Sequence, residues 1–206
     1  MTRFVRSLLT GVGLSLLTSG CALTSKSDSV ILRYFALDDA RSHAVPPPST
    51  PSDQAKTAPL QLRLGRVNAA TYLKDRIAFR DSNEVGYYDD LRWTEKPESY
   101  VRRALARAFF EDRGIKQIIS GFGPTLEVEL GAFEEIRGEK HAVRVEMTWL
   151  LRDEQLASTQ QTFVIERPLR TTKDVAAPAD IASALSGALD EAVQRIVTQV
   201  TASLVP

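Results

Sequence analysis

Cysteine is almost absent from this chain of 206 residues, which contains only Cys21. A single thiol cannot close an internal disulfide, and it cannot build a zinc site, which takes about four ligands. Histidine is nearly as scarce, because only His43, in a proline-rich stretch, and His141, expected at a turn or a sheet edge, are present. The sequence therefore predicts no metal site and no cofactor.

An excess of charge of either sign is also missing, because 26 Lys and Arg face 26 Asp and Glu. Proteins that bind nucleic acids usually carry a strong basic surplus on one face, and a field that attracts anionic headgroups requires a similar surplus. The sequence therefore predicts no nucleic-acid partner.

Motifs of catalysis are lacking too. No serine stands in a G-x-S-x-G elbow. The stretch SGFGP at residues 120–124 has two glycines but lacks the third of a phosphate-binding loop, and it precedes a strand. Glu134 and Glu135 are adjacent, so on a strand they point to opposite faces. We expect both to be surface charges near a hairpin turn at Gly138, and we expect that the protein is not an enzyme.

A hydrophobic run long enough to cross a membrane is missing at the amino terminus. The apolar stretch from Leu8 to Leu17 is roughly half of the about 20 residues that a spanning helix needs. Basic residues precede it, and small residues separate it from Cys21, which is typical of a secretory signal. We expect a signal peptide at residues 1–20, cut between Gly20 and Cys21. A plain cleaved signal and a membrane anchor are the alternatives.

The remaining residues, about 186 of them, are enough for one domain with its own core. Residues 21–30 are small and polar and form the expected tether to a single domain at 31–206. Residues 31–37 are an expected strand, and residues 38–59 are a proline-rich loop that serves as a spacer or, alternatively, as a recognition motif.

Strand patterns resume at residue 60, with a break at Gly65. Short strands follow between residues 75 and 93, separated by two pairs of turn-forming residues, Ser82–Asn83 and Asp89–Asp90. Three alternating strands are expected at residues 124–133, 141–151 and 156–166. Alternation of this kind leaves one face buried and one solvated, as in an antiparallel sheet.

Two helices complete the pattern. The first begins at Pro97 and ends before Gly114, and the second is a long amphipathic helix from about Pro178 to the carboxyl end. Strands, a helix, strands and a helix in this order predict an α+β fold, with an antiparallel-rich sheet and two main helices packed on one face.

Two surfaces are candidates for binding a partner. Arg92 and Trp93 stand out because Arg and Trp are enriched at binding hot spots. The alternative is that Trp93 caps the core beneath the helix that starts near Pro97. The long final helix is the second candidate, unless its apolar stripe packs entirely on the sheet.

The residues Thr18-Ser19-Gly20-Cys21 resemble the lipobox of bacterial lipoproteins. This resemblance implies that fatty acyl chains such as palmitate are attached to Cys21, and several such chains anchor a protein stably. Ala22 follows, whereas an aspartate at this position commonly retains lipoproteins at the inner membrane. The resemblance therefore implies the periplasmic face of the outer membrane.

Three stretches carry a further resemblance: RYFAL, LRLGRVNAATYLKDRIAFR and, above all, YYDDLRWTEKPESYVRRALARAFF. Together with the lipobox, they resemble the ABC-type transport auxiliary lipoprotein family. The resemblance implies a docking role beside an MCE-family protein and its ABC transporter, which move lipids or other hydrophobic molecules across the envelope. It leaves self-association into a homo-oligomer open. A periplasmic lipid-binding carrier is the alternative function.

Overall fold

The computed structural model describes residues 30–37, 59–138, 140–153, 158–172 and 175–205. It divides into two units, residues 1–30 and residues 31–206, and the folded elements all belong to the second. The expected signal peptide, Gly20, Cys21, His43 and most of the proline-rich loop lie outside the described residues.

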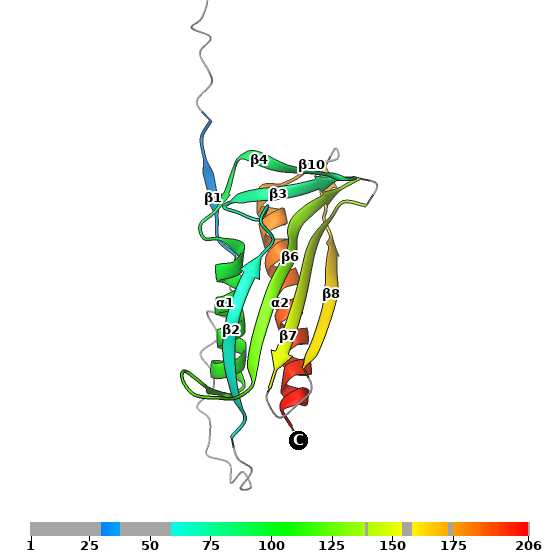
Figure 1. Ribbon diagram of the computed structural model, residues 1–206. Helices are drawn as coiled ribbons and strands as arrows, with labels where there is room; N and C mark the ends of the chain where they lie inside the picture. Colours follow the sequence, from blue (N-terminus) through cyan, green and yellow to red (C-terminus); the bar gives the residue numbers. More distant parts are fainter. Residues whose placement is uncertain (1–29, 38–58, 139, 154–157, 173–174, 206) are drawn as a thin grey trace, which may run out of the picture. The chain divides into compact units, whose positions relative to one another are not determined.

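Eight strands of the described part form one sheet (Figure 1). They are listed here with their bounds: β1 (Arg33–Phe35), β2 (Gln61–Ala69), β3 (Arg76–Asp81), β4 (Glu84–Trp93), β5 (Lys116–Gln117), β6 (Thr125–Arg137), β7 (Ala142–Arg152) and β8 (Thr159–Pro168). A separate small ladder joins β9 (Thr171–Thr172) to β10 (Val175–Ala176).

β6 organises the sheet because it is long enough to pair with two strands along one side. β2 pairs in parallel with its first half and β3 with its second half, while β7 runs antiparallel along the other side. β8 pairs antiparallel with β7, β4 antiparallel with β3, and β1 in parallel with β4. The sheet is therefore mixed, and its longest pairings, β6–β7 and β7–β8, are the antiparallel ones that the alternating sequence predicts.

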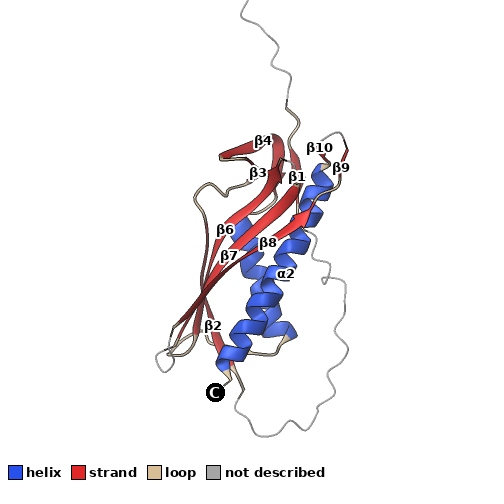
Figure 2. Ribbon diagram, turned by 90° about the vertical axis from the view of Figure 1, so that its right-hand side faces the viewer, coloured by secondary structure: helices blue, strands red, loops and turns tan. Residues whose placement is uncertain are grey.

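Two helices cover one face of this sheet, which confirms the predicted α+β fold (Figure 2). α1 (Pro97–Ala106) starts at the predicted proline and continues as a π-helical segment, Arg107–Asp112. Gly114 follows with a φ of 63°, the left-handed conformation expected just beyond a helix. α2 (Pro178–Leu204) packs on β7 and β8, and its apolar stripe is buried. The stripe is therefore part of the core and offers no open apolar face.

One turn prediction is right and one is wrong. Ser82 and Asn83 do connect β3 to β4, and Ser82 has a positive φ of 53°. Asp89 and Asp90 instead lie within β4, which continues to Trp93. Both aspartates form ion pairs there, Asp89 with Arg76 and Asp90 with Arg33 on β1. A strand that gains a partner on each side tolerates residues that would otherwise favour a turn.

A β-bulge in β6 decides which side chains reach the core. Before it, Leu126, Val128 and Leu130 face the helices, as predicted. The register with β7 shifts between Leu130 and Ala132, so the odd-numbered residues that follow face the helices instead. Phe133 is buried next to the ring of Trp93, at a centroid distance of 5.4 Å. The two glutamates that follow are thereby placed on opposite faces of the sheet.

Candidate functional sites and the family of the chain

Glu134 and Glu135 are buried, with 0% and 1% of their surfaces exposed. The prediction that they are surface charges is therefore wrong. A buried carboxylate needs a cation or several hydrogen-bond donors to compensate for lost hydration. Both partners of Glu134, Tyr72 and Arg80, and one partner of Glu135, Tyr88, stand 47 to 62 residues earlier in the chain, so the local sequence does not reveal them.

Glu134 lies on the sheet face away from the helices. Arg80 donates to its two carboxylate oxygens, over 2.6 Å to Oε1 and 3.3 Å to Oε2. The Tyr72 hydroxyl lies 3.0 Å from Oε2 and 3.1 Å from the Gly131 carbonyl oxygen. Burial and the negative charge of Glu134 raise the pKa of Tyr72, so the phenol stays protonated and remains a donor. The hydrogen bond to Glu134 also raises the pKa of Arg80.

Glu135 lies on the helix-covered face, where it pairs in register with the buried Val143. The Tyr88 hydroxyl donates to it over 2.6 Å, Arg137 Nε over 3.1 Å, and His141 Nε2 lies 2.9 Å from its other oxygen. Burial, followed by the hydrogen bond to Glu135, raises the pKa of Tyr88 to about 12. His141 lies in the turn between β6 and β7, as expected, and its side chain is a mostly buried partner of this carboxylate.

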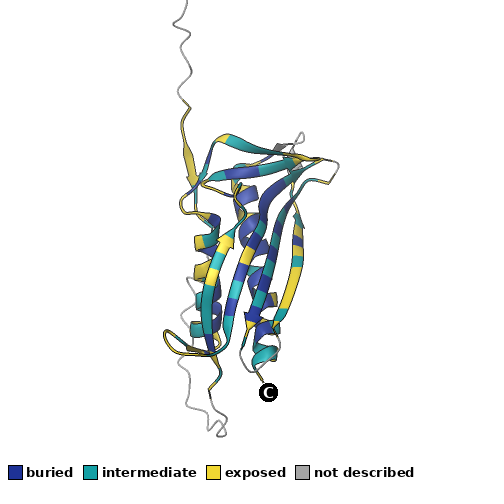
Figure 3. Cartoon of the chain, viewed as in Figure 1, coloured by how far each residue is buried: buried dark blue, intermediate teal, exposed yellow. Residues whose placement is uncertain are grey.

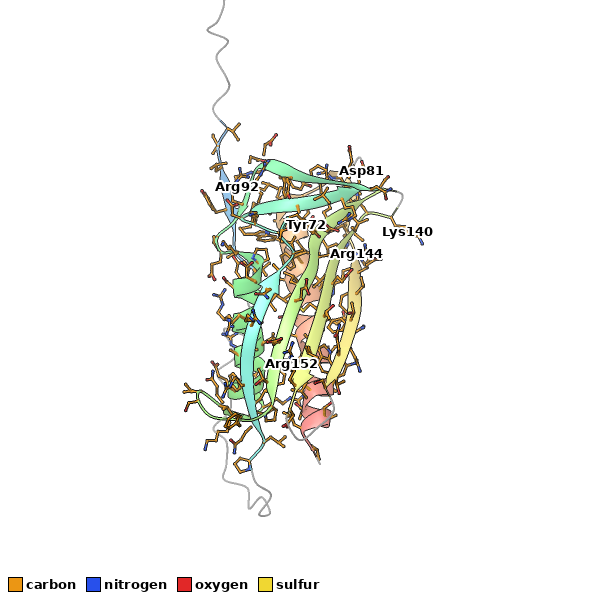
Figure 4. All side chains as sticks on the ribbon, in the orientation of Figure 1. Tyr72, Asp81, Arg92, Lys140, Arg144 and Arg152 are labelled. Atoms are coloured by element: carbon orange, nitrogen blue, oxygen red, sulfur yellow. The ribbon has the colours of Figure 1, made fainter. Side chains whose placement is uncertain are left out.

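The two clusters are built to hold the fold rather than to carry out chemistry. Each carboxylate is matched by an arginine, and each tyrosine keeps its proton near neutral pH. They attach the β3–β4 hairpin and the β6–β7 turn to the rest of the sheet, at the end where Figure 4 shows Asp81 and Lys140. In the part of the chain that the structure describes, no three Asp, Glu, His or Cys side chains gather as a metal site.

Trp93 is in the core, as the alternative interpretation has it. Only 2% of its surface is exposed, and its ring packs edge-on against Tyr100 of α1, at a centroid distance of 6.3 Å. The adjacent Arg92 is held against its own strand, because Nη1 donates to the carbonyl oxygens of Tyr88 and Leu91. The indole therefore has almost no surface left with which to contact a partner.

A groove between α1 and α2 is lined by apolar side chains, including Ala104, Leu189 and Val193, and by as many polar or charged ones, including Arg103 and Gln194. Its volume is about 50 Å³. Pockets that bury a small molecule measure roughly 300–1,000 Å³. The groove is therefore too small to enclose a lipid chain.

Exposed large apolar side chains gather at two places at opposite ends of the sheet. Ile31, Leu32 and Tyr34 lie in and before β1, and Ile119 and Phe122 lie on the loop between β5 and β6. Figure 3 shows both segments as exposed, with β1 at the top and the loop at the bottom. In the sequence, the glycines of this loop suggested only a phosphate cradle, and no apolar contact site was predicted there. The one local signal is Phe122, an aromatic residue between two glycines.

The sequence profile of a family described as "ABC-type transport auxiliary lipoprotein component" matches residues 43–197. The chain belongs to this family. The resemblance seen in the sequence is therefore confirmed, as is the α+β fold. The family is one of transport auxiliary lipoproteins and not a known enzyme family. None of the helices among the described residues combines the length and the apolarity needed to cross a bilayer. A search of curated proteins found no match for this family member.

Solved structures show where the same fold occurs. Protein XCC0632 from Xanthomonas campestris is similar with a TM-score of 0.64 and 21% identity, over 83% of this chain and 97% of that one. A protein described only as uncharacterized gives a TM-score of 0.61 and 15% identity, over 82% and 99%. Protein CT253 from Chlamydia trachomatis gives 0.51 and 9%, over 72% and 99%. At these identities the likeness shows the fold of this auxiliary lipoprotein and nothing about its activity.

Proposed function

We propose that this auxiliary lipoprotein is anchored by acyl chains on Cys21 to the periplasmic face of the outer membrane. There it acts as a docking component of an MCE-type ABC system that moves lipids or other hydrophobic molecules. The observation that carries the proposal is the family match over residues 43–197. The lipobox-like residues up to Cys21 support the anchor, and Ala22 supports the outer membrane.

The filled interior supports docking over the alternative, a carrier that encloses lipid. Most of the large apolar side chains between the sheet and the helices are buried in one continuous cluster. The groove between α1 and α2 offers about 50 Å³, far less than the roughly 300 Å³ at the lower limit of small-molecule pockets. A protein of this kind acts through its surface and its position.

Affinity purification of the acylated chain from envelopes solubilised in mild detergent tests the proposal. A tag after the exposed Val205 avoids both the proposed anchor and the core. We expect an MCE-family protein and the subunits of its ABC transporter to co-purify. Recovery of stoichiometric lipid without any transporter subunit would favour the carrier and contradict docking.

A further inference from the structure

The loop between β5 and β6 ends in two large apolar side chains that face solvent. Ile119 is 86% exposed and Phe122 is 87% exposed, the two highest values among the exposed large hydrophobic residues described. Single apolar residues are common on protein surfaces, whereas apolar side chains exposed together are candidates for an interaction site. Figure 1 shows this loop projecting sideways near the lower end of the sheet, beside the lower end of α1.

The base of the loop is held firmly against β2. The Ile118 amide donates to the Leu62 carbonyl over 2.9 Å, and the Arg63 amide donates to the Pro124 carbonyl over 2.8 Å. The Arg63 guanidinium also donates to the carbonyl of Gly121, at the tip itself. A tip that is fixed before binding loses less conformational freedom when it docks.

Glycines shape the tip so that one isoleucine turns inward and its neighbour outward. Gly121 and Gly123 have φ values of 89° and 148°, which residues that carry a side chain rarely adopt. A Cβ on Gly123 would lie 2.6 Å from Cδ1 of Ile118, so this glycine makes room for Ile118 to close the loop. Ile119 and Phe122 are left on the outer side.

Beside Phe122 is a hollow of about 370 Å³ whose charged walls balance each other. Arg63 and Arg152 supply positive charge, and Glu127 and Asp153 supply negative charge. Arg152 Nη2 lies 3.2 Å from Glu127 Oε2, and Figure 4 shows Arg152 toward the lower end of the sheet. The tip therefore presents exposed apolar side chains next to a polar hollow in which the named positive and negative charges are equal in number.

We propose that Ile119 and Phe122 form the contact by which the domain docks on its protein partner. Phe122 fills an apolar pocket of that partner, and the hollow beside it meets polar groups around the pocket. This proposal rests on the proposed docking function. Buried aromatic anchors surrounded by a polar rim are the usual arrangement of binding energy at protein interfaces.

A protein partner fits the tip better than a membrane does. The tip and β1 lie at opposite ends of the sheet in both ribbon views (Figures 1 and 2). β1 directly follows, in the sequence, the expected tether of residues 21–30, so the tip lies at the end of the sheet opposite to the strand that the tether joins. A surface that binds anionic headgroups also carries an excess of Lys and Arg, which the hollow lacks.

Two hollows on the domain's own surface are poorly suited to receive Phe122 of a second copy. The groove between α1 and α2 has a volume of about 50 Å³. A cavity that accommodates benzene measures about 150 Å³. The hollow on the open sheet face is lined mostly by polar side chains, including Arg66, Glu129 and Gln160. Neither receives the ring of Phe122.

Photocrosslinking in cells tests the contact directly. The photoreactive residue p-benzoylphenylalanine replaces Phe122 in the full acylated chain, and replaces Ile31 in a matched control. Ile31 is 79% exposed and lies at the opposite end of the sheet. We expect light to join position 122, and not position 31, to an MCE-family protein identified by mass spectrometry. An adduct of position 122 with phospholipid, or with a second copy of the chain, would overturn the proposal.

Substitutions give an independent measure. We expect Phe122→Ser to lower co-purification of the MCE-family protein at least about tenfold, while Ile31→Ser retains it. Both side chains are exposed, so neither change should shift the melting temperature. Unchanged recovery with Phe122→Ser would refute the role of the tip and leave the docking function standing. A wild-type chain that recovers no MCE-family protein would overturn both.

Discussion

At the scale of single residues, the two buried glutamates are the most demanding feature of the molecule. A carboxylate taken out of water is tolerated only where cations and donors replace its hydration. Arg80 and Tyr72 do this for Glu134, and Arg137, Tyr88 and His141 do it for Glu135. At this end of the sheet, ion pairs and hydrogen bonds therefore hold the strands together, whereas apolar packing does so in the rest of the domain.

Replacing Glu134 should reveal this dependence. Glu134→Ala leaves Arg80 without its carboxylate in a mostly buried place, and we expect the free energy of unfolding to fall by about 3 kcal/mol. Glu129→Ala, on the same strand but exposed, should change it by less than about 0.5 kcal/mol. Urea denaturation of both variants measures the difference. Equal effects would mean that the Glu134 cluster is not needed for stability.

The half-buried tyrosines should make the protein sensitive to alkali. The pKa of Tyr88 is raised to about 12 in the folded chain, against about 10 when unfolded. The folded state therefore holds this proton more tightly than the unfolded state does. Its contribution to the free energy of unfolding is fully present below pH 10 and is lost as the pH rises from 10 to 12.

Tyr88→Phe should reduce that decline, because phenylalanine has no proton to lose. Urea denaturation at pH 9 and at pH 11 measures it for the wild type and the variant. Absorbance of phenolate in the folded protein gives a second readout, in which the wild type should have a tyrosine that ionises near pH 12 and is missing from the variant. Identical alkaline profiles would contradict the assignment.

At the scale of elements, β8 is an edge strand whose backbone points alternately toward β7 and toward solvent. The Leu169 amide donates to the His141 carbonyl over 2.9 Å, and the pairing continues without a shift to Thr159. Hydrogen-bonded pairs alternate along an antiparallel ladder. The amide of Gln161, opposite Trp149, therefore faces β7, whereas the amide of Gln160 faces outward.

Proline at these two neighbouring glutamines should have very different effects. Gln161→Pro removes a donor of the ladder and leaves a carbonyl unpaired, and we expect a loss of about 2–4 kcal/mol. Gln160→Pro removes an amide that bonds only to solvent, and we expect a loss below about 1 kcal/mol. Both side chains are exposed, so packing contributes little to the difference. Similar melting temperatures for the two variants would contradict this register.

At the scale of the whole molecule, the folded domain and the proposed attachment residue belong to different parts of the sequence. The unit of residues 31–206 contains the sheet, both helices and the core, whereas Cys21 belongs to the unit of residues 1–30. A change at Cys21 should therefore alter where the protein is found without altering how stably it folds.

Cys21→Ser removes the thiol to which acyl chains would be attached. We expect this variant to leave the membrane fraction, while Ser27→Ala, in the same expected tether, stays there. The free energy of unfolding should match the wild type for both. Immunoblots of fractionated cells and mass spectrometry of the mature amino terminus provide the measurement. A Cys21→Ser variant that remains in the membrane fraction would disprove anchoring through this residue.

Local patterns in the sequence were sufficient to predict most of the regular structure. β6, β7 and β8 alternate apolar and polar side chains, and α2 repeats its apolar residues at helical spacing, because each element buries one face. Pro97 and Gly114 likewise mark a helix start and a helix end through their own backbone preferences. These features depend on neighbours within a few residues, so one chain without any relative reveals them.

Only the tertiary structure decided which polar groups are buried and which apolar groups are exposed. Glu134 meets Arg80 and Tyr72, which stand 54 and 62 residues before it, and a bulge in β6 sets the face on which it lies. Trp93 became a core residue because Phe133 and Tyr100 enclose it. Phe122 is exposed on a loop whose tip is bonded to Arg63, far back in the chain. Burial depends on contacts between distant residues, which local spacing does not encode.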